Sequence, residues 1–165
     1  MKWIFAAALA LSLNVQAAPA APDNAHLKAV QGLLEAMQAE KLVRMKAGMA
    51  RYANDAQRQA VNAKVDKVAP QTIYTRLAAP VAQLVSEETA TEMTRYYRTP
   101  AGQKVVYAMY NSRASLVDTK PQFTAAEKAD MKRPAFVKAQ KAFSEAEPLI
   151  GRQAFLLVQK IAKEK

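Results

Sequence analysis

Two glutamates are the strongest candidates for chemistry in this sequence. Glu88 and Glu92 are four residues apart, so a helix through this segment places both carboxylates on one face. Such a pair can share a hard cation or act as an acid and a base. Arg95 lies within reach and can neutralise Glu92, and the sequence supplies neither a third ligand nor a calcium-loop pattern. We therefore expect a solvated, charged helix face.

Composition excludes most other catalytic and metal chemistry. The 165 residues include no cysteine and one histidine, His26. Without cysteine there can be no disulfide, thiolate zinc site, iron–sulfur cluster or cysteine nucleophile. The serines lack a candidate base, and the four glycines are too scattered for a phosphate-binding loop. We expect His26 to be exposed, and we predict no catalytic residue, no cofactor and no metal site.

Residues 1–17 have the parts of a secretory signal peptide. Lys2 supplies a positive start, residues 4–13 are an apolar run, and Val15 and Ala17 occupy the positions that a signal peptidase reads. Spanning a bilayer takes roughly 20 apolar residues, so this run is too short. We predict cleavage after Ala17, no transmembrane span after cleavage, and a periplasmic mature chain.

The positive charge is spread along the chain. Lysine and arginine number 24 against 14 aspartates and glutamates, a formal charge of +10. Basic residues exceed acidic ones by 8 to 5 in residues 18–67, by 5 to 3 in 68–117 and by 10 to 6 in 118–165. Nucleic-acid modules usually concentrate their charge and interleave aromatic residues. We therefore expect no nucleic-acid partner, and anionic envelope surfaces fit this diffuse charge better.

Apolar residues at steps of three and four predict helices in the first half of the chain. One stripe covers residues 27–37 and a second covers 42–60, with a break near Ala39 because the two stripes are out of phase. A third helix lies between Pro70 and Pro80, with a kink or boundary near Pro80. The predicted helix caps are Asp23 or Asn24, Ser86, Thr99 and Thr124.

The second half continues in the same pattern. A helix begins after Ser86, and the next runs from Pro100 towards Leu116 and Val117. A further helix follows Thr124, is interrupted by Pro134 and resumes through residues 136–143, before a last apolar helix from Ile150. No run alternates long enough for a strand. We predict an all-α fold: a leader over 18–24, then one domain over 25–165, a bundle of about six or seven helices, some kinked at proline.

A faint internal repeat is visible at an offset of about 38 positions. Val85-Ser86, Met93 and Arg95 recur as Phe123-Thr124, Met131 and Arg133. Duplication is one interpretation. The other, which we prefer, is that two helices share the same start signals.

Residues 85–104 resemble the bacterial domain-of-unknown-function family 2059. The matching positions are Ser86, Glu87 and Glu88 at the helix start and Tyr96, Tyr97, Thr99, Pro100, Gly102 and Lys104 at its end. Val85, Thr89 and Ala90 depart from that family's usual phenylalanine, glutamate and leucine. The resemblance implies an exported helical domain with no established activity.

The end of this segment is also a candidate interaction motif. It consists of Tyr96, Tyr97, Arg98, Thr99, Pro100, Gly102 and Lys104. Tyrosine and arginine are common at binding hot spots. The interpretation we favour is structural: one tyrosine packs inward, Thr99-Pro100 sets a turn, and Gly102 allows close helix approach.

We therefore predict a non-enzymatic exported protein that binds an envelope protein or an anionic envelope surface. The alternative is a carrier or chaperone-like protein with an apolar groove between helices, lined by Met37, Met45, Met49 and Met93. The groove hypothesis requires an apolar cavity of roughly several hundred cubic ångströms. The sequence does not determine the partner or the oligomeric state.

Overall fold

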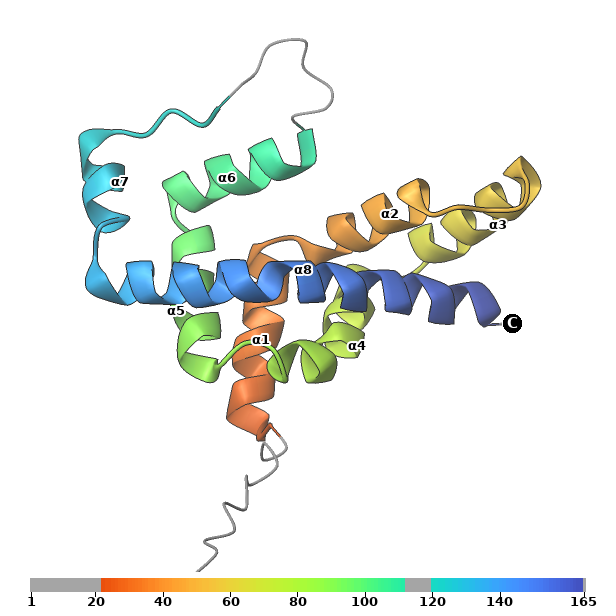
Figure 1. Cartoon of the computed structure of the whole chain (residues 1–165), viewed down its shortest axis with the longest axis horizontal. Coiled ribbons are helices and arrows are strands. Elements are labelled where there is room, and N and C mark those ends of the chain that lie inside the picture. Colours follow the sequence, from red (N-terminus) through yellow and green to blue (C-terminus); the bar gives the residue numbers. More distant parts are fainter. Residues whose placement is uncertain (1–21, 112–119, 165) are drawn as a thin grey trace, which may run out of the picture.

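The structure, a computed structural model, describes residues 22–111 and 120–164, and this part of the chain is helical without a strand (Figure 1). Its helices are α1 (Asn24–Ala36), α2 (Ala39–Met49), α3 (Asp55–Asp66), α4 (Pro70–Ala82), α5 (Glu87–Tyr97), α6 (Pro100–Asn111), α7 (Ala125–Asp130) and α8 (Pro134–Lys163). The predicted all-α fold is confirmed, with eight described helices in place of six or seven.

The long helix α8 organises the molecule. Figure 1 shows it running from α7 at one end to α3 and the C-terminus at the other. It contacts α2, α3, α4 and α5, while α1 packs against α4 and α5. Its buried side chains recur every three or four residues, and Phe136, Phe143, Ile150 and Leu157 are spaced by seven. This stripe is the apolar face that holds the other helices together.

The prediction of two helices in the region of α8 is wrong. Residues 134–163 form one helix of 30 residues that contains Pro148. Pro134 stands in its first turn, where proline costs no hydrogen bond. Pro148 is exposed, and the buried stripe continues on both sides of it. Packing of that stripe therefore outweighs the local cost of an interior proline, about 3 kcal/mol.

The break between α1 and α2 is confirmed. Gln38 has a left-handed backbone, with φ of 54°, and its N–H donates to the carbonyl oxygen of Glu35 at 3.0 Å. This turn changes the helix direction so that Leu34 and Val43 both reach the core. One residue with a left-handed backbone, Gln38, therefore accounts for the phase difference between the two apolar stripes.

The predicted continuation of the second stripe to residue 60 is wrong. α2 ends at Met49, and α3 starts after Asn54, whose Oδ1 accepts the Gln57 N–H at 2.8 Å. Tyr52 donates its hydroxyl to the Ala47 carbonyl at 2.8 Å and so closes the turn. An N-cap and a turn thus override a pattern that looks helical.

The other local predictions are largely confirmed. Asp23, Ser86 and Thr124 accept backbone N–H groups as N-caps, and Thr124 forms a full capping box with Glu127. α4 continues two residues past Pro80 and ends at Ala82, which agrees with a boundary there.

His26 differs from its expectation. It is half-buried, and its Nε2 lies 2.7 Å from the carbonyl oxygen of Val85. A contact to Val85, which lies just before the N-cap of α5, therefore links the start of α1 to the start of α5.

Several predictions fall on residues outside the described ranges. These are the signal peptide over 1–17, most of the leader over 18–24, and Leu116 and Val117, which lie beyond the last described residue of α6, Asn111. Within 22–111 and 120–164, no helix combines the length and apolarity needed to cross a membrane.

Candidate functional site

The candidate motif builds the turn between α5 and α6. The Thr99 hydroxyl donates to the Tyr96 carbonyl at 2.7 Å and accepts the Gly102 N–H at 3.1 Å. A β-carbon on Gly102 would lie 2.5 Å from Cα of Tyr97. Only glycine fits at this distance, so Gly102 permits the close approach of the two helices, as the structural interpretation requires.

Both tyrosines of the motif pack inward, where one was expected to do so. Tyr96 and Tyr97 are each 4% exposed. The ring centroid of Tyr96 lies 4.4 Å from that of Phe136, and that of Tyr97 lies 6.1 Å from that of Phe143. The rings therefore anchor α5 to α8 and do not form an outer surface.

The cationic residues of the motif lie on the outside. Arg98 is exposed and its Nη2 is 3.8 Å from Oε2 of Glu35. Lys104 Nζ contacts the Glu127 carboxylate at 2.9 Å, and this hydrogen bond lowers the pKa of Glu127. Pro100 is exposed at the first turn of α6. The seven motif residues thus do not converge on one patch.

The buried tyrosines instead face an apolar cleft of about 550 Å³. It lies between α5, α6, the residues before α7, and the N-terminal half of α8. Its apolar and aromatic walls are Met93, Met109, Met131, Tyr96, Tyr97, Phe123, Phe143, Val105, Ala108 and Pro121. Its polar lining is Lys120, Gln140, Ser144 and Glu147. A mostly apolar cleft of this size with a few polar groups is typical of a small-molecule site.

The hydroxyls of Tyr96 and Tyr97 differ from those of the other covered tyrosines in their hydrogen bonding. Tyr52, Tyr74 and Tyr110 each donate a hydrogen bond, to Ala47, Glu40 and Met37. These three acceptors show how the fold normally satisfies a tyrosine that it covers.

Neither Tyr96 nor Tyr97 has such a partner among the described residues. Neither hydroxyl oxygen is among the fully enclosed polar atoms that lack a hydrogen bond. Each hydroxyl oxygen is therefore not fully enclosed, and since both tyrosines line the cleft, both hydroxyls are candidates to donate to a ligand there.

Burial keeps these two hydroxyls protonated. Burial is the main cause that raises the pKa of Tyr97, with a further contribution from Glu147. It also raises the pKa of Tyr96, with contributions from Glu127 and Asp130. At neutral pH both tyrosines are therefore neutral hydrogen-bond donors.

The predicted methionine groove is wrong in three of its four residues. Met37 is buried in the core, Met45 is half-buried, Met49 is 55% exposed, and of the four only Met93 lines this cleft. Met109 and Met131 take their place. Both stand at apolar positions in the sequence, but helical spacing cannot show that α6 and the α7–α8 connection face each other.

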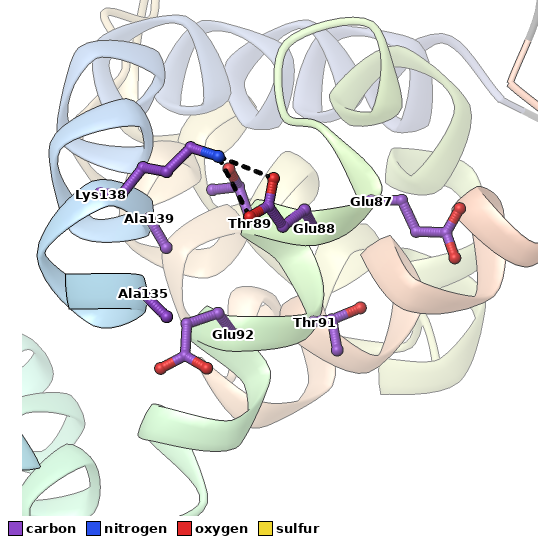
Figure 2. A pocket seen from close by; sticks show the side chains of 8 residues that line it. All are labelled: Glu87, Glu88, Thr89, Thr91, Glu92, Ala135, Lys138 and Ala139. Atoms are coloured by element: carbon purple, nitrogen blue, oxygen red, sulfur yellow. Dashed lines mark hydrogen bonds and ion pairs between the residues drawn. The ribbon is translucent and has the colours of Figure 1, made fainter. Parts of the chain in front are cut away.

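The glutamates line a separate, charged pocket of about 500 Å³ (Figure 2). Figure 2 shows Glu88 directed at Lys138, with Oε2 and Nζ 3.0 Å apart, while Glu87 points away. Glu92 contacts Arg95 at 3.1 Å and also pairs with Arg133. Both carboxylates are thus neutralised by cations. In the described part of the chain, no three histidine or acidic side chains are grouped to hold a metal ion.

The two segments of the faint repeat meet at one ion-pair network. Arg95 contacts Glu92 and Asp130, the latter at 3.0 Å. Arg133 contacts the same two carboxylates, with Asp130 at 2.6 Å. Arg95 and Arg133, which are 38 residues apart, therefore make the same contacts with Glu92 and Asp130, although α5 has 11 residues and α7 has 6.

Residues 85–104, on which the sequence-based prediction of a resemblance to domain-of-unknown-function family 2059 depends, cover α5 and the start of α6, and that resemblance stays a prediction. Comparisons of the chain with known protein families, with curated proteins and with solved structures found no match.

Proposed function

We propose that this chain is a non-enzymatic, exported binding protein of the bacterial cell envelope. In this proposal it holds a small, neutral, largely apolar molecule in the cleft between α5, α6 and α8. The observation that carries the proposal is that Tyr96 and Tyr97 line this cleft and that neither hydroxyl has a hydrogen-bond partner among residues 22–111 and 120–164. It develops the carrier alternative, with different methionines in the lining.

The lining defines the chemistry of the ligand. Methionine and aromatic side chains adapt to apolar molecules of varied shape. A purely apolar ligand would cover the two hydroxyls without a hydrogen bond, which costs about 1–3 kcal/mol for each group. A ligand with a carbonyl, ester or ether oxygen avoids this cost. Glu147 and Lys120 both line the cleft, so the lining has no net charge and fits a neutral ligand.

The ion pairs of Glu88 and Glu92 support the non-enzymatic part of the proposal. A general acid or base must lie within hydrogen-bond reach of its substrate, and carboxylate oxygens that contact lysine or arginine are already engaged. Glu88 contacts Lys138, and Glu92 contacts Arg95 and Arg133.

Binding in the cleft can be measured with prodan, a neutral naphthalene dye that carries a ketone and shifts its emission when it leaves water. Ser144→Phe places a ring at the cleft, because Ser144 is exposed and lines it. Ala142→Phe is the matched control, because Ala142 is exposed on the same helix and does not line the cleft. We expect saturable prodan binding that Ser144→Phe weakens and Ala142→Phe leaves unchanged. Equal binding by both variants would refute the site.

The hydroxyls are tested by the double variant Tyr96→Phe with Tyr97→Phe. Two lost hydrogen bonds of about 0.5–1.5 kcal/mol each weaken prodan binding roughly tenfold. N-phenyl-1-naphthylamine, which lacks a carbonyl acceptor, should bind the variant as well as the original chain. A uniform loss for both dyes would mean that the hydroxyls do not select the ligand.

Export is tested in a Gram-negative host. We expect the chain in the periplasmic fraction, with a mass that corresponds to a start at Ala18. Ala17→Lys changes the residue next to the cleavage site and should leave the signal attached. Recovery of the unprocessed chain from the cytoplasm would contradict both the signal peptide and the envelope location.

A further inference from the structure

α4 and the C-terminal half of α8 form a surface without an acidic side chain of their own. α4 contains no aspartate or glutamate, and neither does residue range 148–163 of α8. A groove of about 390 Å³ separates the two helices. It is lined by Arg76, Lys160, Lys163, Leu77, Pro80, Leu156, Leu157, Gln153 and Gln159.

Two exposed leucines continue this surface along α8. Leu149 is 46% exposed and Leu156 is 36% exposed. They are seven residues apart, so they lie on one side of the helix, and Arg152 lies between them on that side. Lys160 and Lys163 follow at four and seven residues beyond Leu156. From Leu149 to Lys163 this face extends about 21 Å.

The cations of this face are available to a partner. Arg152, Lys160 and Lys163 form no ion pair within residues 22–111 and 120–164. By contrast, the cations beside the glutamates of α5 and α7 are engaged in ion pairs; these are Arg95, Lys104, Arg133 and Lys138.

Among the described residues, Arg76 is the one cation of the groove with an acidic partner. Its Nη1 lies 2.6 Å from Oε1 of Glu164, so the charge of Arg76 is balanced by a carboxylate of the chain itself. Four cations against this single carboxylate leave a local charge of +3.

We propose that this α8 basic face, which consists of Leu149, Arg152, Leu156, Lys160 and Lys163 with Arg76, docks the protein on a bilayer that contains anionic phospholipid. The leucines enter the boundary between headgroups and acyl chains, and the cations contact lipid phosphates. Cations spread along about 21 Å match the repeated charges of a bilayer surface, whereas a single small anion would need them to converge. This function lies beyond the ligand cleft, which occupies the other half of α8.

The test compares two triple variants with the same change in net charge. Arg152→Gln, Lys160→Gln and Lys163→Gln remove cations from the face. Lys28→Gln, Lys128→Gln and Lys132→Gln remove three exposed cations from α1, α7 and the residues that follow α7, and none of these three has an ion pair in the described ranges. Both triples keep the same N-terminal residues, so any effect of that segment on vesicle binding cancels in the comparison.

Cosedimentation with phosphatidylcholine vesicles, with and without phosphatidylglycerol, gives the readout. We expect binding only when phosphatidylglycerol is present, and a decrease of about fivefold for each cation removed from the face, roughly 100-fold for the triple. The control triple should lose far less. Equal losses in the two triples, or no binding to phosphatidylglycerol vesicles, would overturn the proposal.

The two exposed leucines provide a second, independent test of bilayer binding. Leu149→Ser with Leu156→Ser should weaken vesicle binding in a chain that remains folded by circular dichroism, while Val137→Ser, at a residue 51% exposed near the other end of α8, should not weaken it. Retention of the chain by a soluble acidic polypeptide, abolished by the same face triple and accompanied by no binding to phosphatidylglycerol vesicles, would assign the face to a protein partner and overturn the bilayer. All of these measurements are made without prodan, so their outcome is independent of the cleft.

Discussion

Removal of a tyrosine hydroxyl should affect stability differently in the core and at the cleft. Tyr74 and Tyr97 are both buried, at 7% and 4% exposed, so replacing either with phenylalanine keeps a buried ring. The Tyr74 hydroxyl donates to Glu40 Oε2 at 2.6 Å, and Glu40 is itself only 8% exposed. The Tyr97 hydroxyl has no partner in the described structure. The same chemical change should therefore have two different effects.

The magnitudes follow from these contacts. Tyr74→Phe removes a hydrogen bond to a charged group and leaves a buried carboxylate without that donor, which costs about 1.5–3 kcal/mol. Tyr97→Phe removes no protein hydrogen bond, so we expect a change within ~0.5 kcal/mol. For a domain of this size, 2 kcal/mol corresponds to a decrease in Tm of roughly 4–8 °C.

Urea unfolding followed by far-ultraviolet circular dichroism measures both variants against the original chain. We expect a lower midpoint for Tyr74→Phe, an unchanged midpoint for Tyr97→Phe and equal slopes. If Tyr97→Phe were as destabilising as Tyr74→Phe, its hydroxyl would have a protein partner. The reasoning that offers this hydroxyl to a ligand would then be refuted.

Three further predictions concern the backbone and pH. Gly102→Ala should destabilise the fold by about 3 kcal/mol, because the new β-carbon would clash with the backbone of α5. Gly48→Ala should be neutral or stabilising, because no atom lies within 4 Å of the new β-carbon. Similar changes in Tm for the two variants would contradict this prediction. Gln38→Gly should raise the free energy of unfolding by about 1 kcal/mol because Gln38 has a left-handed backbone, and a lower urea midpoint would argue against that strain. Burial raises the folded pKa of Tyr74, Tyr97 and Tyr110 above the unfolded value of about 10, so their contribution is complete below pH 10 and is lost at higher pH. Tyrosinate absorbance should therefore rise together with unfolding in an alkaline titration, and full ionisation in a chain that stays folded would contradict the burial.

The local features of the fold could be predicted from the sequence. Ser86 and Thr124 cap their helices, and Arg95 pairs with Glu92, because each interaction joins residues only three positions apart. The all-α class follows from apolar residues at helical spacing along the whole chain. The break near Ala39 is also visible, since two stripes out of phase cannot share one straight helix.

The extent of the helices depended on packing as well as on local signals. Pro148 lies inside one 30-residue helix because the buried stripe of α8 continues past it, and no local rule weighs that burial against the lost hydrogen bond. The end of α2 at Met49 likewise depends on a cap at Asn54 and a turn closed by Tyr52, which override a continuing apolar pattern.

The cleft was decided by tertiary structure alone. Met93, Met109 and Met131 come together from α5, α6 and the residue after α7, and helical spacing specifies a face without naming what it will meet. Burial of both Tyr96 and Tyr97 depends on Phe136 and Phe143, about 40 residues further along the chain. The sequence thus determined the helical class and several helix caps through interactions over a few residues. The arrangement that leaves two tyrosine hydroxyls open to a ligand required contacts between distant segments.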